Sequence, residues 1–161
     1  MSVQPVKPRP RFLDTATFHV FMKYISRAHV WLYRNTGGRV GSRMPVSAKK
    51  VLPVCILTHT GRKSGKEFQT PLLFLPDGDR VVLFAAQGGL PKHPQWYLNL
   101  KANPRCTISL PGHTRDWEAR TATADERAVL FPRMIKHYRG WADYQSWCDR
   151  EIPVVICERV S

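Results

Sequence analysis

The stretch that decides the fold is residues 51–75, which read VLPVCILTHTGRKSGKEFQTPLLFL. Residues 51–58 are a short apolar run, typical of a buried strand. Residues 61–66 form a tight basic turn. Residues 68–75 then predict the returning strand, in which Pro71 indicates an edge or a bulge. A connection of hairpin length indicates antiparallel pairing.

The same alternation of strands and turns continues toward the C terminus. Further strands are predicted over 80–86, 105–110, 115–123 and 153–159. A short helix is predicted after Pro94, a capping box at Thr123 and Glu126 begins another, and residues 141–149 are helical. Six strands at this spacing predict an α+β fold. We expect a split, closed or partly closed barrel of about six mainly antiparallel strands with flanking helices, as one domain over residues 1–161.

The N-terminal part predicts a flexible basic arm over 1–13 and an amphipathic helix over 14–35 that ends at Gly37. Two interpretations of this helix stay open: it packs on the barrel, or it lies on an anionic membrane surface. The expected apolar face comprises Phe18, Phe21, Met22, Ile25, His29 and Leu32, opposite Lys23, Arg27 and Arg34.

The net charge of +13 is concentrated before Glu67. Residues 1–66 hold 13 Lys and Arg but one acidic residue, Asp14, so they carry +12. An excess of this size predicts an anionic partner. The apolar fraction of 43% and the charged fraction of 23% exclude wholesale disorder, collagen and coiled coil.

The four cysteines have no CxxC spacing, so we expect reduced, buried thiols and no metal. No apolar run reaches the length of a membrane span, and the N terminus lacks the apolar segment of a secretory signal. These features predict a cytoplasmic protein.

The basic turn is not a P-loop, because three residues rather than four separate its glycines and Glu67 follows Lys66. Two interpretations of this turn stay open. Its cations, hydroxyl and backbone amides can bind an anion, or it is a solvated basic turn. Ser64 and Ser146 have no recognisable histidine partner, and no catalytic triad is visible. If the chain is an enzyme, a bound cofactor carries the chemistry.

Six motifs along the chain form one pattern: Thr60-Gly61-Arg62-Lys63-Ser64-Gly65, Thr70-Pro71-Leu72, Gly88-Gly89, Pro94-x-Trp96-Tyr97-x-Asn99-Leu100-x-Ala102-Asn103-Pro104, Asp143-Tyr144-Gln145-Ser146-Trp147 and Ile152-Pro153-Val154-Val155. Together they resemble the deazaflavin (coenzyme F420)-dependent nitroreductase family. The resemblance implies a split barrel that binds reduced F420, a flat deazaflavin with a phosphate and an oligoglutamate tail. Family acceptors include quinones, unsaturated lactones and nitroaromatic compounds, and some members associate with membranes through the N terminus.

The resemblance also assigns site residues. Tyr138, Trp141 and Tyr144 are expected to shape the acceptor site, with a proton from either tyrosine or from water. The best-known nitroreductases differ at Leu73, Ala86, Gln87 and Trp141. The expected cofactor-binding residues are Arg62, Lys63, Ser64, Gly65, Thr70, Pro71, Ala86, Gln87, Gly88, Gly89, Gln95, Trp96 and Asn99.

The resulting hypothesis is an F420H2-dependent reductase that transfers a hydride to a planar, electron-poor acceptor such as a quinone. Two alternatives remain: an FMN-binding split-barrel oxidoreductase, or a non-catalytic basic module on an anionic membrane. No nucleic-acid partner is expected. We expect a cytoplasmic protein with peripheral contact to the inner face of the cell membrane.

Overall fold

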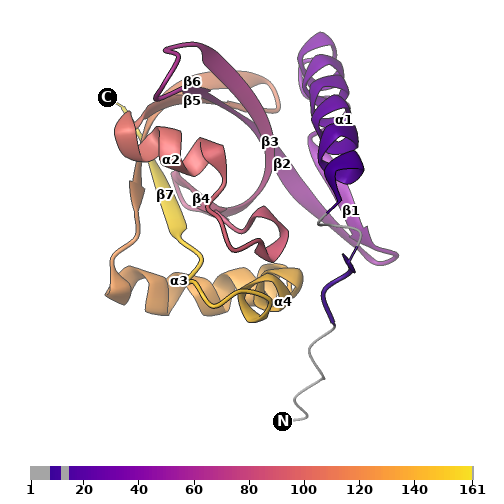
Figure 1. Cartoon of the computed structure of the whole chain (residues 1–161). Helices are drawn as coiled ribbons and strands as arrows, with labels where there is room; N and C mark the ends of the chain where they lie inside the picture. Colours follow the sequence, from indigo (N-terminus) through magenta and orange to yellow (C-terminus); the bar gives the residue numbers. More distant parts are fainter. Residues whose placement is uncertain (1–7, 12–14, 161) are drawn as a thin grey trace.

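The chain folds into a closed antiparallel barrel with helices at its side and base (Figure 1). The computed structural model describes residues 8–11 and 15–160, and the side chains of Ala16, Phe18 and His19 are also outside the description. Most of the predicted arm and Asp14, the first residue of the predicted helix, therefore lie outside the described residues. The predicted split-barrel fold is confirmed. The barrel strands are β2 (Lys50–Thr60), β3 (Glu67–Asp77), β4 (Arg80–Phe84), β7 (Val154–Arg159), β6 (His113–Thr121) and β5 (Arg105–Leu110).

Strand β2 is the pivot of the barrel. Its first half pairs with β1 (Arg43–Ser47), and its second half pairs with β3 on one side and with β5 on the other. The β2–β5 pairing closes the barrel. Strand β1 was not expected, because its five residues lack the apolar run that marks the other strands.

Two apolar cores lie on the two faces of the barrel wall. On β4, Val81 and Leu83 point into the barrel, whereas Val82 and Phe84 face the helices below. Strand β7 divides its residues in the same way. Burial on both faces explains why these strands read as continuous apolar runs rather than as alternating ones. The covering helices are α3 (Ala124–His137) and α4 (Gly140–Ser146), while α2 (Gln95–Ala102) lies across one end of the barrel.

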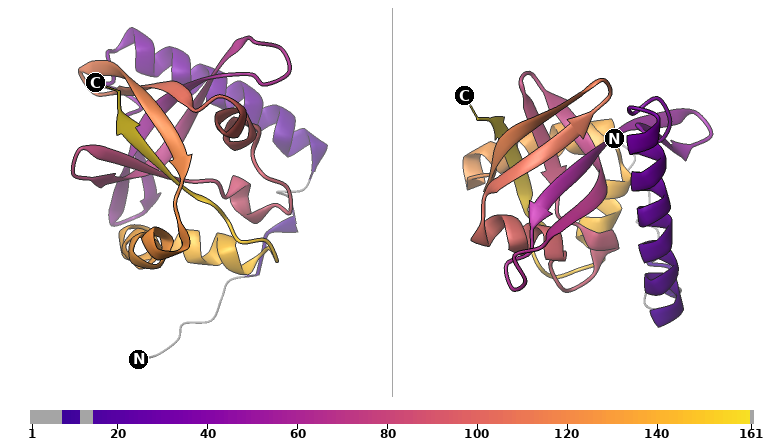
Figure 2. Two further views of the ribbon diagram at one scale, coloured as in Figure 1. Left: turned by 90° about the vertical axis from the view of Figure 1, so that its left-hand side faces the viewer. Right: turned by 90° about the horizontal axis from the view of Figure 1, so that it is seen from above.

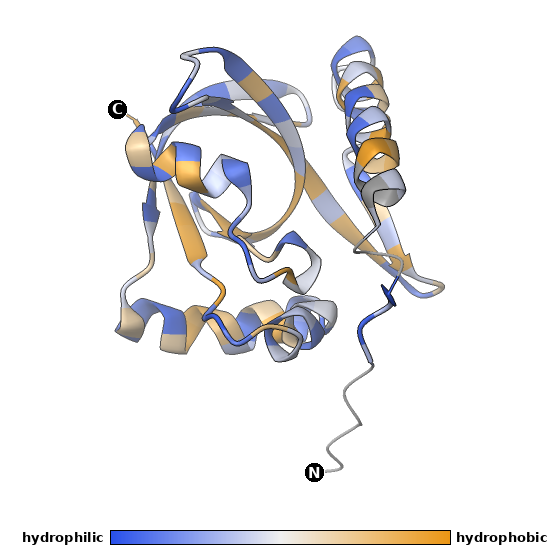
Figure 3. Ribbon diagram, in the orientation of Figure 1, coloured by the Kyte–Doolittle hydropathy of each residue, from blue (hydrophilic) through white to orange (hydrophobic). Residues whose placement is uncertain are grey.

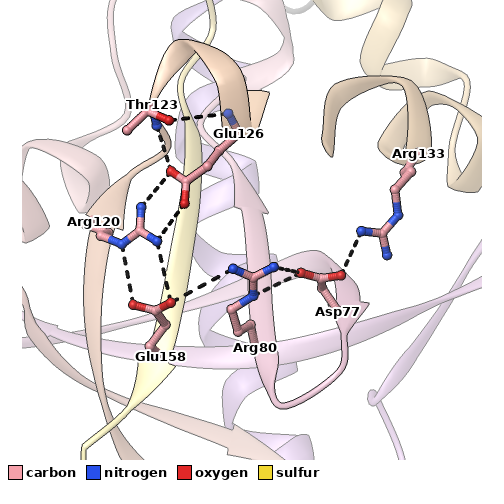
Figure 4. Close-up of polar contacts among 7 residues, drawn as sticks. All are labelled: Asp77, Arg80, Arg120, Thr123, Glu126, Arg133 and Glu158. Carbon is pink, nitrogen blue, oxygen red and sulfur yellow. Dashed lines mark hydrogen bonds and ion pairs between the residues drawn. The ribbon is translucent and has the colours of Figure 1, made fainter. Parts of the chain in front are cut away.

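The predicted capping box begins α3. Glu126 N donates to Thr123 Oγ1 (3.3 Å), and Thr123 N donates to the Glu126 carboxylate (2.9 Å). The same carboxylate accepts two bonds from Arg120 of β6. Farther along α3, Arg133 donates to Asp77 at the β3–β4 turn (2.7 Å). Arg80 of β4 and Glu158 of β7 connect these two contacts into one surface network, which joins α3 to four strands: β3, β4, β6 and β7 (Figure 4).

Helix α1 (Ala16–Asn35) lies along the outside of the barrel beside β1, β2 and β3 (Figures 1 and 2). Among its described side chains it buries Val30 and Tyr33, and the Tyr33 hydroxyl donates to the Ser109 carbonyl (3.1 Å). The predicted apolar face is therefore wrong as a packing face, because Phe21 and Ile25 remain exposed. The mixed hydropathy of the helix is visible in Figure 3. Within the described part of the chain, no helix has the length and apolar character needed to cross a membrane.

Candidate functional site

A cavity of about 600 Å³ opens where the barrel wall is incomplete. The second half of β3 (Phe74–Asp77) pairs with β4, whereas residues 67–73 pair with β2 alone. Pro71 lies in this one-sided segment, as its missing N–H requires. The cavity is lined by His59, Gly61, Arg62, Lys63, Ser64, Phe68, Gln69, Thr70, Leu72, Phe84, Gln87, Pro94, Gln95, Trp96 and Asn99.

The basic turn between β2 and β3 is docked on α2 at one end of this cavity. Arg62 N and Arg62 Nη1 both donate to Asn99 Oδ1 (3.1 and 3.2 Å), and Nη1 also donates to Gln95 Oε1 (2.9 Å). Gly61 is required here, because a Cβ at this position would lie 2.5 Å from the Phe68 ring. The glycine therefore lets an aromatic side chain close over the base of the turn.

The turn presents positive charge that no carboxylate of the described residues neutralises. Within residues 8–11 and 15–160, neither Arg62 nor Lys63 forms an ion pair with a carboxylate. Ser64 Oγ accepts from Lys66 N (3.3 Å), which leaves its hydroxyl proton available for a ligand. Two cations and a hydroxyl at the mouth of a cavity form a site suited to an anionic group.

Other parts of the cavity lining are apolar and aromatic. Trp96 of α2 and Phe84 at the end of β4 are both buried and line the cavity, together with the half-exposed Phe68. Their rings offer flat surfaces against which a conjugated ring system can pack. The cavity thus combines a cationic end with aromatic walls.

A buried histidine lies at the floor of the site. His59 is 4% exposed, and its ring contacts Asn99 Nδ2 through Nδ1 (3.1 Å) and Thr70 Oγ1 through Nε2 (3.2 Å). Burial lowers the pKa of His59 to about 4, so the ring is neutral at physiological pH.

The turn after β4 is held from behind by one arginine. Arg150 donates to the carbonyl oxygens of Ala85, Ala86 and Leu90 (3.0–3.2 Å) and to His93 Nδ1 (3.2 Å). The 3₁₀ turn η2 (Gln87–Gly89) lies within this clamp, and Gln87 adopts a positive φ of 48°. Arg150 therefore shapes the segment that presents Gln87 to the cavity.

Gly89 has a packing role. It has a φ of +73°, and a Cβ on it would lie 2.8 Å from the Tyr144 carbonyl oxygen of α4. Its amide donates to Ala86 O (3.0 Å) and is not free for a ligand. Gly88 has open space around it.

Eight of the thirteen predicted cofactor-binding residues line the cavity. They are Arg62, Lys63, Ser64, Thr70, Gln87, Gln95, Trp96 and Asn99. The other five are not among the lining residues: Gly65, Pro71, Ala86, Gly88 and Gly89.

The three residues predicted for the acceptor site cluster outside this cavity. Tyr138 packs edge-on against Trp141 (5.6 Å between ring centroids) and lies 6.4 Å from Tyr144. Trp141 is buried and packs against Phe84 (6.0 Å), which lines the cavity. Burial, followed by the neighbouring Tyr138, raises the pKa of Tyr144. The cluster thus stands behind Phe84, with the Tyr144 phenol protonated.

Trp96 was predicted from the sequence, but His59, Phe68 and Phe84 were missed. His59 precedes the basic turn by two residues, and its place after the apolar run 51–57 marks it as a polar side chain inside a buried strand. Such a side chain needs a hydrogen-bond partner, which is a usable signal. Phe68 and Phe84 carry no comparable signal, since an aromatic at a strand end is ordinary core.

Comparison with known proteins gives a consistent result. The family model described as F420H(2)-dependent quinone reductase matches residues 25–159. A Mycobacterium tuberculosis (strain H37Rv) protein named F420H(2)-dependent quinone reductase is 32% identical over 149 residues, covering 83% of this chain and 89% of that protein. A second relative from the same strain, provisionally named in the same way, is 40% identical over 114 residues, covering 71% of this chain and 96% of that protein.

A solved structure agrees with these relatives. The F420-H2 dependent reductase FDR-A superposes with a TM-score of 0.61 at 37% identity, covering 66% of this chain and 94% of FDR-A. Residues 25–159, which the family model matches, include all six barrel strands and every residue that lines the cavity.

Proposed function

Since this chain belongs to the F420H2-dependent quinone reductase family, we propose that it is an oxidoreductase that uses reduced F420 to reduce a quinone. The observation that carries the proposal is the cavity itself. It joins a cationic turn, free of carboxylate partners among the described residues, to aromatic walls of Trp96, Phe84 and Phe68. A flat ring with a polyanionic tail requires this combination.

The residues present fit the cofactor in their chemistry. The cavity volume of about 600 Å³ lies within the range of small-molecule sites. Arg62, Lys63, Ser64 and Gly65 would hold the phosphate and the start of the acidic tail by charge-assisted hydrogen bonds. When bound, reduced F420 supplies the hydride. The ring would be lined by Thr70, Gln87, Gln95, Trp96 and Asn99, with Pro71, Ala86, Gly88 and Gly89 supporting these residues from behind.

The acceptor is proposed to lie in the part of the cavity that Phe84 lines, next to the aromatic cluster. Trp141 supports Phe84 by ring packing, and Tyr138 and Tyr144 lie next to it. The raised pKa of Tyr144 keeps its phenol protonated, so that it can donate a hydrogen bond to a quinone oxygen. These residues also exclude water from that side of the cavity.

Titration of the purified protein with oxidised F420, followed by quenching of the cofactor's fluorescence, tests the proposal. We expect saturable binding that weakens at least tenfold in the double variant Arg62→Ala, Lys63→Ala, more strongly for long glutamate tails. Lys101→Ala is the matched control, because Lys101 lies on α2 but outside the cavity. Absence of F420 binding at micromolar concentration would overturn the proposal, and binding of FMN in its place would select a flavin enzyme.

We further propose that α1 makes peripheral contact with an anionic membrane. Phe21, Tyr24 and Trp31 are 59–66% exposed, and Lys23 and Arg27 are on the same helix. A helix that presents apolar rings and cations to solvent matches the composition of interfacial helices. Such contact would bring the cavity close to a lipid-soluble quinone. Co-sedimentation with phosphatidylglycerol vesicles tests this, and Trp31→Ala with Phe21→Ala should reduce it while F420 binding is retained.

A further inference from the structure

His59 stands out because a polar ring is buried at the floor of the cavity with both nitrogens engaged. Nδ1 lies 3.1 Å from Asn99 Nδ2, and Nε2 lies 3.2 Å from Thr70 Oγ1. Phe68 covers the ring in a stacked arrangement, with 6.0 Å between the centroids. Both hydrogen-bond partners line the cavity. The histidine therefore connects two opposite parts of the site, α2 and β3.

The protonation of the ring follows from its partners. Asn99 Oδ1 accepts from Arg62 N and Arg62 Nη1, so the amide nitrogen of Asn99 must face His59. An amide nitrogen donates, so His59 Nδ1 must accept and carry no proton. The proton of a neutral imidazole is then on Nε2, from which it is donated to Thr70 Oγ1.

This direction determines what Thr70 offers to a ligand. Its hydroxyl oxygen accepts from His59, and among the residues that the structure describes it has no other hydrogen-bond partner. The hydroxyl proton is consequently free to be donated into the cavity. The same ring keeps Asn99 in the orientation that docks Arg62.

We propose that His59 is a positioning residue: its Nε2–H tautomer keeps the Thr70 hydroxyl as a donor toward the bound ring and keeps Asn99 turned so that the Arg62 turn is docked. The inference rests on the proposed function, since it takes the cavity to be the F420 site. It assigns His59 no contact with the reacting atoms.

The surroundings of His59 favour the neutral ring. The charged group nearest in the network is the Arg62 guanidinium, which shares Asn99 with it, and the residue opposite on β5 is the buried thiol Cys106. No carboxylate is paired with His59 among the described residues. A second proton would place an N–H at Nδ1 against the N–H of Asn99, and the amide would have to turn away from Arg62.

Nitrogen-15 NMR of histidine in the ligand-free protein tests the tautomer without any cofactor. At pH 7 we expect the His59 signal, assigned by its loss in His59→Asn, to show a protonated Nε2 and an unprotonated Nδ1. In Asn99→Asp the donor becomes an acceptor of the same shape, and Nδ1 of His59 should become protonated. A protonated Nδ1 in the unaltered chain, or no change in Asn99→Asp, would overturn the proposal.

Binding of oxidised F420 tests the consequence for the site. His59→Leu should weaken binding at least tenfold, whereas His59→Asn, which retains an acceptor near Nδ1, should recover part of the loss through Asn99 and Arg62. Thr70→Val should weaken binding without altering the His59 tautomer. Equal binding by the unaltered chain and all three variants would overturn the inference. If His59→Leu does not fold, F420 binding is compared between the unaltered chain, His59→Asn and Thr70→Val. Equal binding by these three proteins would then overturn the inference.

The two readouts separate the inference from the proposed function. An unaltered chain that shows the expected tautomer but binds no F420 refutes the proposed function alone. A chain that binds F420 but carries its proton on Nδ1 refutes the role of His59 alone.

Discussion

The burial of His59 predicts a specific loss of stability in mild acid. The native ring is neutral because burial lowers its pKa from 6.5 to about 4, whereas the unfolded chain returns it to its ordinary value. Between these two values the unfolded state binds more protons than the native state. The free energy of unfolding therefore decreases as the pH falls through this window.

The size of the effect follows from the shift. The full shift in the pKa of His59 corresponds to roughly 3 kcal/mol of the free energy of unfolding, at 1.36 kcal/mol for each pKa unit. Between pH 7 and pH 5, about 2 kcal/mol of it is lost. Glu126 of the surface network acts at lower pH: hydrogen bonds from Arg120 lower its pKa from 4.5 to about 2, so its contribution is lost as the pH falls from about 4.5 to about 2.

Urea unfolding at pH 7 and pH 5 measures this effect, with His59→Asn as the matched variant that cannot titrate. His93 and His137, whose pKa values are also lowered by burial, contribute equally to both proteins and cancel in the difference. The unaltered chain should lose about 2 kcal/mol more than the variant over this interval. An equal pH dependence of the two proteins would refute the reasoning.

Other substitutions test the packing around the site. Gly89→Ala should lower the melting temperature more than Gly88→Ala. Both positions have a positive φ, but only a Cβ at Gly89 would clash with the backbone of α4. Equal shifts of the two variants in differential scanning calorimetry would contradict this. Arg150→Met should increase hydrogen exchange over residues 85–90, because four hydrogen bonds to that segment and to His93 are lost; unchanged exchange would argue against the clamp. Thr123→Ala should destabilise the protein by about 1 kcal/mol in urea unfolding, because the α3 cap is lost. An unchanged free energy of unfolding would show that this cap does not stabilise the protein.

Much of the barrel was predictable because it depends on local patterns. Apolar runs of strand length, proline and glycine turns and the Thr123–Glu126 capping box all act within a few residues, and the observed elements follow them. The cationic turn at Arg62 and Lys63 was predictable for the same reason, since its charge is a property of the sequence.

The faces and partners of these elements were less predictable. The helical period of α1 indicated an apolar face through Phe21 and Ile25, but the barrel packs against Val30 and Tyr33 instead. A hydropathy pattern identifies a helix with two kinds of face, and it does not say which neighbour covers either of them.

By itself the sequence determined the strand order along the chain, the caps and turns, and the concentration of positive charge before Glu67. Only the tertiary structure decided that Asn99 of α2 meets His59 and Arg62, that Gly89 serves α4 rather than a ligand, and that the tyrosine cluster stands behind Phe84. Local conformation depends on neighbours in sequence, whereas these contacts join residues about 40 or more positions apart in most cases and exist only once the barrel has closed.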